Sequence, residues 1–270
     1  MGGKQNGKRT DEAVGNRYRY AAQRQQEILR ILRTTGEITV TGVSAQLDVT
    51  GETIRKDLIV LEQQGLLRRV HGGALPVEHA SFEPPVASRL EYSEEKRNIA
   101  RAALAHLPHT GSVLLDAGST TTELAELLPP ERELTIFTNT LPIALTLVTR
   151  PKFAVYPLGG RLRETTLAVV EGWAARQLEE INVDVAFLGT NGISLTRGLT
   201  TPDPAEAAIK RLMLHAAHKR VLLADSSKFD VATQCQHATL ADIDVLITDS
   251  GLSDTDRAEI EKHGVTVEIA

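Results

Sequence analysis

The chain has 270 residues, of which 41% are hydrophobic and 24% charged, a composition typical of a globular protein with one or two domains. No apolar run reaches the roughly 18 residues that a membrane-spanning helix needs. Residues 1–20 also lack the apolar stretch of a secretory signal. Cys235 is the only cysteine, which excludes an internal disulfide and a metal site with several thiolates. We therefore expect a cytoplasmic protein that does not cross a membrane.

The net charge of −5 is distributed unevenly along the chain. Residues 1–76 carry 12 Lys and Arg against 8 Asp and Glu, whereas the remaining residues carry 18 against 27. Such an asymmetry indicates a nucleic-acid-binding segment joined to a domain of another kind. A basic excess this small does not identify a DNA-binding domain by itself.

Four segments follow one another in the sequence. Residues 1–20 are polar, glycine-rich and basic, and we expect them to form a disordered tail. Residues 21–75 have the pattern of short helices followed by a hairpin. Residues 76–92 contain the stretch PVEHASFEPP, which is typical of a linker. Residues 93–270 have the pattern of an α/β domain.

Two short helices are predicted at the start of the second segment. Apolar residues recur at helical spacing over residues 23–34, and Gly36 follows as a stop signal. A shorter helix is predicted for residues 41–47. Asp48 comes directly after it, at a turn, where Asp tolerates a left-handed backbone better than most residues.

The third predicted helix begins after Thr50, which is a good N-cap, and carries Glu52 in its first turn. Gly65 is a plausible C-terminal cap. Strand character over residues 66–70 and a turn at residues 71–73 predict a β-hairpin wing, and therefore a winged helix-turn-helix. The apolar stripe of the third helix, at spacing i, i+4 and i+7, consists of Ile54, Leu58 and Leu61.

With that stripe turned inward, polar residues of the third helix lie on its flank and outer face. Arg and Lys can donate to guanine in the major groove, and Thr can contact bases or phosphates. The basic residues of the wing suit phosphates or the minor groove. A surface helix with solvated cations would explain one Arg-Lys pair, but not its combination with a basic hairpin. The predicted DNA-binding residues are Thr50, Glu52, Thr53, Arg55, Lys56, Arg68, Arg69 and His71.

After the linker, apolar runs alternate with helical patterns, which predicts a mostly parallel sheet covered by helices on both faces. The predicted strands are residues 113–115, 134–137, 153–158, 183–188, 221–224, 245–248 and 265–269. The predicted helices are residues 94–107, 121–128, 173–181, 205–217 and 254–263.

The segment DAGSTTT, residues 116–122, follows the first of these strands and opens a helix. Glycine and hydroxyl residues at a helix N-terminus present donors to an anion, although ordinary N-capping uses the same residue types. Parallel α/β sheets bind ligands at the carboxyl ends of their strands. Four more polar segments lie at comparable positions, and Lys210 lies on the predicted helix that follows residues 200–203. The convergence of these groups predicts a polar, phosphorylated ligand. These segments are residues 138–140, 158–161 (with Gly160), 188–192 and 224–228.

Residues 50–74, TGETIRKDLIVLEQQGLLRRVHGGA, closely resemble the N-terminal signature of the DeoR family of bacterial regulators, S-x-x-T-I-R-R-D-L-x-x-L-x-x-x-G-x-L-x-R-x-H-G-G-A. Thr50 replaces the usual Ser, and Lys56 replaces the second Arg, which loses planar bidentate hydrogen bonding. The resemblance covers about residues 22–270, because DAGSTT, VDVAFLGTNGI, GLTTPDPAEAAIKR and VLLADSSKF look like the sensor domain of that family.

The resemblance implies a Rossmann-like sensor domain related in fold to ribose-5-phosphate isomerase and glucosamine-6-phosphate deaminase. It also implies that the effector is a sugar phosphate. The residues that would hold the phosphate are Gly118, Ser119, Thr120 and Thr121. The residues that would line the rest of the site are Asp116, Asn139, Gly189, Lys210 and Lys228, and we add Gly160 from its position after a predicted strand.

Two alternatives remain open for the second domain. It could isomerise or deaminate a sugar phosphate, which requires a carboxylate base. The related isomerases carry a D-G-A-D-E loop, whereas the equivalent loop here, residues 189–193, has no carboxylate, and only Asp203 and Glu206 lie nearby in sequence. The domain could also be a dimerisation module without a ligand, but this would not explain the polar groups at its strand ends.

We therefore expect a transcription regulator, a repressor of carbohydrate-metabolism genes, whose binding to double-stranded operator DNA is modulated by a phosphorylated sugar. A homodimer or homotetramer would present paired winged helices to half-sites in successive major grooves. Phe82, the linker prolines and the helix from Glu94 are expected to couple the two domains. We expect no catalytic residue, no metal and no cofactor.

Overall fold

The computed structural model describes residues 21–35, 37–63, 66–75, 89 and 91–270. The chain divides into two compact units, Met1–Pro84 and Pro85–Ala270. The predicted tail, Gly36, Gly65 and most of the predicted linker, with Phe82, lie outside the described residues. Each unit is considered by itself below.

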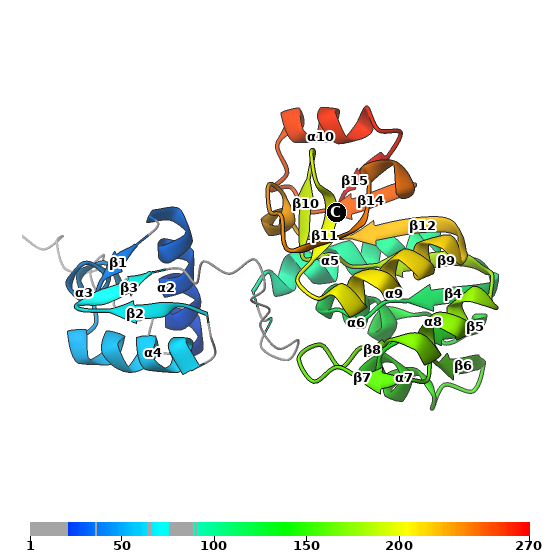
Figure 1. Ribbon diagram of the computed structural model, residues 1–270, viewed down its shortest axis with the longest axis horizontal. Coiled ribbons are helices and arrows are strands. Elements are labelled where there is room, and N and C mark those ends of the chain that lie inside the picture. The colour runs from blue at the N-terminus through cyan, green and yellow to red at the C-terminus, as the bar shows by residue number, and fades with distance from the viewer. Residues whose placement is uncertain (1–20, 36, 64–65, 76–88, 90) are drawn as a thin grey trace, which may run out of the picture. The chain divides into compact units, whose positions relative to one another are not determined.

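In the first unit, the described residues form three helices and a small antiparallel sheet (Figure 1). The sheet has the order β1-β3-β2, so the hairpin of β2 and β3 is extended by β1. The predicted helices and wing are confirmed, whereas β1 was not predicted because two residues are too few to show alternation. The elements are α2 (Ala21–Thr35), β1 (Ile38–Thr39), α3 (Val40–Leu47), α4 (Gly51–Gln63), β2 (Arg68–Val70) and β3 (Gly73–Leu75).

Caps and a shared core fix the position of α4 in this unit. Asp48 ends α3 with φ 52° and ψ 48°, the left-handed conformation expected there. Thr50 Oγ1 accepts a hydrogen bond from the Thr53 N–H at 3.2 Å, which is the predicted N-cap. The predicted stripe of α4 is buried against apolar residues of α2 and α3. The interior positions of α4 are thereby fixed, and Glu52, Arg55 and Lys56 face outward.

The second unit is built on a seven-stranded parallel sheet with the order β15-β14-β12-β9-β4-β5-β6. All seven predicted strands are present. Their bounds are β4 (Thr110–Leu115), β5 (Glu133–Thr138), β6 (Phe153–Pro157), β9 (Val183–Leu188), β12 (Ala217–Leu223), β14 (Val245–Thr248) and β15 (Thr266–Ile269).

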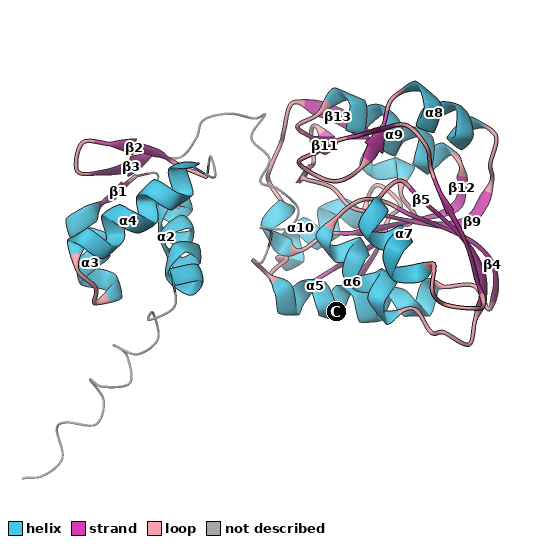
Figure 2. Ribbon diagram, turned by 90° about the horizontal axis from the view of Figure 1, so that it is seen from below, coloured by secondary structure: helices cyan, strands magenta, loops and turns pink. Residues whose placement is uncertain are grey.

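Helices cover both faces of this sheet (Figure 2). Along β4, Leu114 packs into the core shared with α8, α9 and α10, whereas Val113 and Leu115 pack into the core shared with α5, α6 and α7. The five predicted helices are confirmed, and α7 was not predicted. The helices are α5 (Ser93–Ala103), α6 (Ser119–Leu127), α7 (Leu141–Leu147), α8 (Gly172–Glu179), α9 (Pro204–His215) and α10 (Asp254–Glu261).

Short strands outside the main sheet form two small antiparallel sheets, one of them with the order β10-β11-β13 and the other formed by β7 and β8. β13 packs against α9. Among the helices of the described residues, none is long and apolar enough to cross a membrane. The short strands are β7 (Arg161–Leu162), β8 (Val169–Val170), β10 (Gly192–Ser194), β11 (Gly198–Thr201) and β13 (Cys235–Ala238).

Candidate functional site

The outer face of α4 carries the side chains that the sequence assigns to DNA. Glu52, Arg55 and Lys56 are exposed, and Thr53 is half-buried beside its cap, Thr50. Arg55 Nη1 lies 3.5 Å from Glu52 Oε2, and both side chains of this pair are exposed. An exposed pair of this kind is weak, so Arg55 can leave it for a base or a phosphate. Contact of these residues with DNA stays a prediction.

The wing presents Arg68, Arg69 and His71 to solvent, but Arg69 also has a partner within the unit. The Arg69 backbone N–H donates to Glu62 Oε1 at 2.9 Å, and Arg69 Nε donates to Glu62 Oε2 at 2.6 Å. These hydrogen bonds lower the pKa of the Glu62 carboxyl. The pair joins the wing to the end of α4, a function that the sequence did not indicate for either residue.

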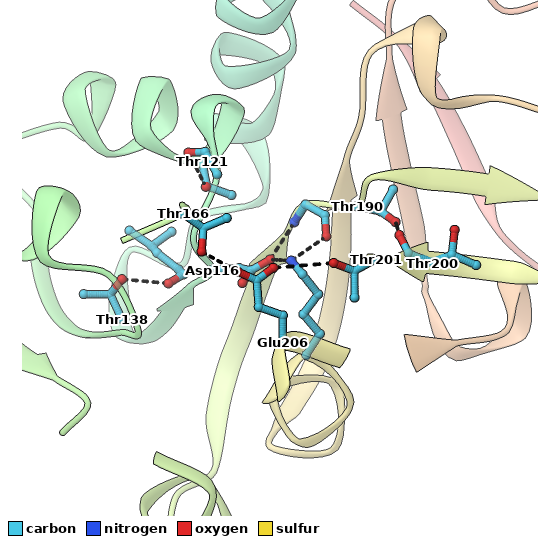
Figure 3. Close-up of polar contacts among 12 residues, drawn as sticks. Asp116, Thr121, Thr138, Thr166, Thr190, Thr200, Thr201 and Glu206 are labelled. Atoms are coloured by element: carbon cyan, nitrogen blue, oxygen red, sulfur yellow. Dashed lines mark hydrogen bonds and ion pairs between the residues drawn. The ribbon is translucent and has the colours of Figure 1, made fainter. Parts of the chain in front are cut away.

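At the carboxyl edge of the large sheet, Asp116, Gly189 and Lys210 form one polar network (Figure 3). The Lys210 ammonium pairs with Asp116 Oδ2 and donates to the Gly189 carbonyl at 3.0 Å. The Gly189 N–H donates to Asp116 Oδ2 at 3.0 Å. Asp116 follows β4, Gly189 follows β9, and Lys210 lies on α9, so three predicted site residues are brought into contact.

Two buried acceptors at this edge have no partner among the described residues, namely Asp116 Oδ1 and Asn139 Oδ1. The two side chains are 1% and 2% exposed. Burying an acceptor without a hydrogen bond is unfavourable, and the exceptions in native proteins need an explanation. Ligand hydroxyl groups are donors that would satisfy both oxygens.

The N-terminus of α6 lies next to Asp116 in the chain and begins after Gly118. The hydroxyl groups of Thr121 and Thr122 both donate to the Gly118 carbonyl, at 3.0 and 2.8 Å. Thr121 is fully buried and its hydroxyl already has an acceptor, so this hydroxyl is not available to a phosphate. Ser119 is half-buried, which makes its hydroxyl and the first N–H groups of the helix the available donors.

Gly160 and Lys228 have neighbours outside the Asp116 network. A Cβ on Gly160 would lie 2.8 Å from Val169 Cγ1 and 2.9 Å from the Val170 carbonyl oxygen, and the φ of Gly160 is +151°. Close packing on β8 therefore explains this glycine without a ligand.

Lys228 lies in the 3₁₀ turn η3 (Ser226–Lys228), where its positive charge lowers the pKa of Lys96.

Lys96 is a buried residue that the sequence analysis missed. Its ammonium donates to the carbonyl oxygens of Glu91 at 2.5 Å and Arg89 at 3.2 Å, just before α5. Burial lowers the pKa of Lys96, and Asp225 opposes this shift. A signal was present in the sequence, because Lys96 occupies the same helical stripe as the buried Ile99, Ala100 and Ala103.

Both carboxylates considered for catalysis already have polar partners. Buried Glu206 accepts hydrogen bonds from Arg163 Nη1 at 2.9 Å and from the Thr166 hydroxyl (Figure 3). Asp203 caps α9 by accepting from two backbone N–H groups, both at 2.9 Å. It also pairs with Arg163 Nε at 3.1 Å. Both acids therefore hold the start of α9 in place.

A winged helix followed by an α/β domain with a polar site at its strand ends defines a DNA-binding transcription regulator. The model of the DeoR-like helix-turn-helix domain matches residues 24–79, and that of the DeoR C terminal sensor domain matches residues 91–250. The chain belongs to the DeoR family of transcriptional regulators.

Two relatives cover most of the chain. The HTH-type transcriptional regulator GlpR of Haloferax volcanii is 38% identical over 247 residues, which is 91% of this chain and 96% of the relative. The transcriptional repressor AccR of Agrobacterium fabrum is 33% identical over 230 residues, covering 84% and 89%. Ribose 5 phosphate isomerase A from Neisseria gonorrhoeae has a TM-score of 0.38 and 19% identity, covering 52% and 54%, a likeness that concerns the fold alone.

Proposed function

We propose that this regulator represses carbohydrate-metabolism genes and that a phosphorylated sugar weakens its hold on operator DNA. The Asp116–Gly189–Lys210 network beside the start of α6 carries this proposal. It combines a buried cation, unpaired acceptors and a helix N-terminus, which are the groups that a sugar phosphate needs. The name of one relative, a transcriptional repressor, supports repression.

In the proposed complex, each part of the ligand has a matching group. The phosphate accepts hydrogen bonds from the Ser119 hydroxyl and from the N–H groups of Ser119 and Thr120, where the helix dipole also favours negative charge. Sugar hydroxyl groups donate to Asp116 Oδ1 and Asn139 Oδ1, the two unpaired acceptors. Lys210 holds the Asp116 carboxylate in place for this contact.

On the DNA, α4 lies in the major groove and Arg68 and His71 of the wing contact the backbone. Two or more subunits would place paired winged helices on two half-sites about one helical turn apart. Binding of the sugar must favour one arrangement of the subunits over another, by ~1–3 kcal/mol in a typical allosteric protein. Lys96 supports a route for this coupling, because it lies near Lys228 and holds the chain that leads into α5.

Catalysis on the sugar is the weaker alternative. The residues 189–193 loop has no carboxylate, and both Glu206 and Asp203 are held by Arg163. A domain that only dimerises leaves the two unpaired buried acceptors without an explanation. Binding without turnover is therefore the function that the site supports best.

A thermal-shift screen of the full chain against a panel of sugar phosphates tests the ligand class, because a ligand that binds only the folded state raises its stability. The matching unphosphorylated sugars should give no shift. A ligand found in this way should release operator DNA in a mobility-shift assay. Turnover of any compound in the panel would support the enzyme alternative instead.

The double variant Ser119→Ala with Thr120→Ala should keep its affinity for the operator and lose release by the ligand. A matched control is Ser194→Ala with Thr196→Ala, which removes a hydroxyl pair on the β10–β11 turn. This control should still respond to the ligand. A normal response of the Ser119 and Thr120 variant would place the phosphate elsewhere.

A further inference from the structure

A cavity of ≈ 260 Å³ lies between α9, β13 and the 3₁₀ turn η4 (Leu240–Asp242). Figure 2 shows β11 and β13 beside α9. The volume is below the roughly 300–1,000 Å³ of pockets for drug-sized ligands, so it suits a small molecule. Polar and charged residues that line it are Arg211, His215, Arg220, Gln236, His237 and Asp242.

His237 is the unusual member of this lining. Its side chain is 2% exposed, and within the part of the chain that the structure describes neither ring nitrogen has a hydrogen-bond partner. An imidazole has one donor and one acceptor when neutral and two donors when charged. Leaving both ring nitrogens without hydrogen bonds in the interior is unfavourable. The unpaired nitrogens of His237 therefore indicate that a polar molecule binds here and completes the hydrogen bonds.

The charges around the cavity favour an anion. Arg211 donates through one Nη2 bond to the Gln236 carbonyl at 3.0 Å and is otherwise exposed, so further N–H donors of its guanidinium are available. The acidic member of the lining, Asp242, accepts the N–H and the hydroxyl of Thr239, both at 2.7 Å. Its charge is therefore largely satisfied within the turn.

Arg220 and His215 also lie on this wall. Arg220 pairs with Asp244 through Nε and Nη2, both at 3.1 Å, so it contributes more to the shape of the wall than to net charge. His215 is exposed at the end of α9. The C-terminal end of that helix does not attract anions, so the side chains of Arg211 and His237 would have to supply the attraction.

We propose that this cavity is a second ligand site, which binds the oxyanion group of a small metabolite between Arg211 and His237. It is separate from the site at Asp116. The two sites meet at adjacent residues of α9, because Lys210 pairs with Asp116 whereas Arg211 bonds to β13. This proposal goes beyond the sugar-phosphate function and does not depend on it.

Protonation of His237 gives the site a measurable property. Burial lowers the pKa of His237 well below 6.5, and the positive charges of Lys210 and Arg211 lower it further. An anion bound beside the ring opposes these effects and stabilises the imidazolium. The affinity of the site for the anion should therefore increase as the pH falls. The other ionisable groups on the cavity wall are His215, Arg220 and Asp242.

The site can be tested by NMR of the full chain with ¹⁵N-labelled histidine. The chain has 8 histidines, and the ring signals of His237 are assigned from the variant His237→Gln. Inorganic phosphate should shift these signals with saturation, and more tightly at lower pH, whereas chloride at equal ionic strength should not. Acetate tests how selective the site is. If acetate also shifts the signals, the site accepts any oxyanion, and if it does not, the site is specific for phosphate.

Three variants of the full chain test where the anion binds. Arg211→Gln should weaken phosphate binding at least tenfold, whereas Arg197→Gln, an exposed arginine on the β10–β11 turn, should have no effect. The Ser119→Ala with Thr120→Ala variant should retain the shift. Loss of the shift in that variant, an unchanged response in Arg211→Gln, or no saturable shift at all would overturn the proposal.

Discussion

The guanidinium of Arg24 and the carboxylate of Asp57 form a buried ion pair that joins α2 to α4. Arg24 Nη2 donates to Asp57 Oδ1 at 3.1 Å, and Gln25 Nε2 donates to the same oxygen at 3.1 Å. The side chains of the pair are 10% and 4% exposed. Because Asp57 follows Arg55 and Lys56 directly, the pair helps to fix where these two side chains point.

Replacing Arg24 with Met would leave the Asp57 carboxylate buried without its charged partner. We expect the free energy of unfolding of the DNA-binding unit to fall by about 3–5 kcal/mol, as measured by denaturant titration of the full chain. The pair formed by exposed Arg30 and half-buried Glu27, also on α2, gives the control. Arg30→Met should cost less than about 1 kcal/mol. Equal losses in the two variants would contradict a special role for the buried pair.

Arg55→Ala should weaken operator binding and relax the base preference by ~1–3 kcal/mol at one position. The reason is that an arginine on the outer face of a major-groove helix can donate two hydrogen bonds to guanine. Affinities for operators with single base changes provide the measurement. If all these operators lose affinity equally, Arg55 contacts a phosphate instead.

Glu62→Ala separates a positioning effect from a charge effect. Removing a carboxylate near DNA would, through charge alone, strengthen binding. Because Glu62 holds the wing through Arg69, we expect operator binding to be about tenfold weaker. Arg69→Ala should give a similar loss, and the double variant should be little worse than either. Tighter binding by Glu62→Ala would show that charge dominates.

Lys96→Met should leave ligand binding intact but prevent it from releasing the operator DNA. Methionine keeps the apolar stem of the side chain but loses the hydrogen bonds to the carbonyls of Arg89 and Glu91. We expect the thermal shift with the ligand to persist, while release of the operator is reduced at least tenfold. Arg97→Met is the matched control, because Arg97 is the exposed neighbour and its contact with Glu123 is 4.0 Å long. Normal release by Lys96→Met would exclude this route.

His237 should make the stability of the sensor domain depend on pH. The pKa of His237 is lowered in the folded state, so below about pH 6.5 the unfolded chain takes up a proton that the folded chain refuses. Stability should fall by about 1.4 kcal/mol per pH unit below that point. His237→Gln should lack this contribution, and comparing the two proteins cancels the other histidines. Identical pH profiles would show that His237 does not stay neutral.

Local spacing was sufficient to predict most of the fold. The stripe of α4, the left-handed Asp48 and the seven strands of the large sheet are properties of neighbouring residues. In contrast, β1 has two residues and α7 has seven, which is too short for a periodic pattern to be distinct. Their positions depend on partners elsewhere in the fold.

The sites were predicted less completely, since their contacts join distant parts of the chain. Arg24 and Asp57 are 33 residues apart, and no local pattern indicates such a pair. Lys210 and Asp116 are 94 residues apart. Asp116 was predicted from its position at the end of a strand, and both residues were assigned to the site by resemblance to the sensor domain of the family. The inward hydroxyl of Thr121 depends on the geometry of one turn, which residue types alone do not determine.

The separation of core and site along each strand has a consequence for how such regulators diversify. The two cores are formed by residues within the strands and on the helices that cover them, whereas Asp116, Asn139 and Gly189 come after the strands have ended. Substitutions in these loops leave the packing within the strands unchanged, although replacing Asp116 would leave the buried Lys210 without its charged partner. Under the proposed function, a change of ligand would therefore require few mutations, whereas a one-residue insertion inside β4 would exchange its two faces and destroy both cores.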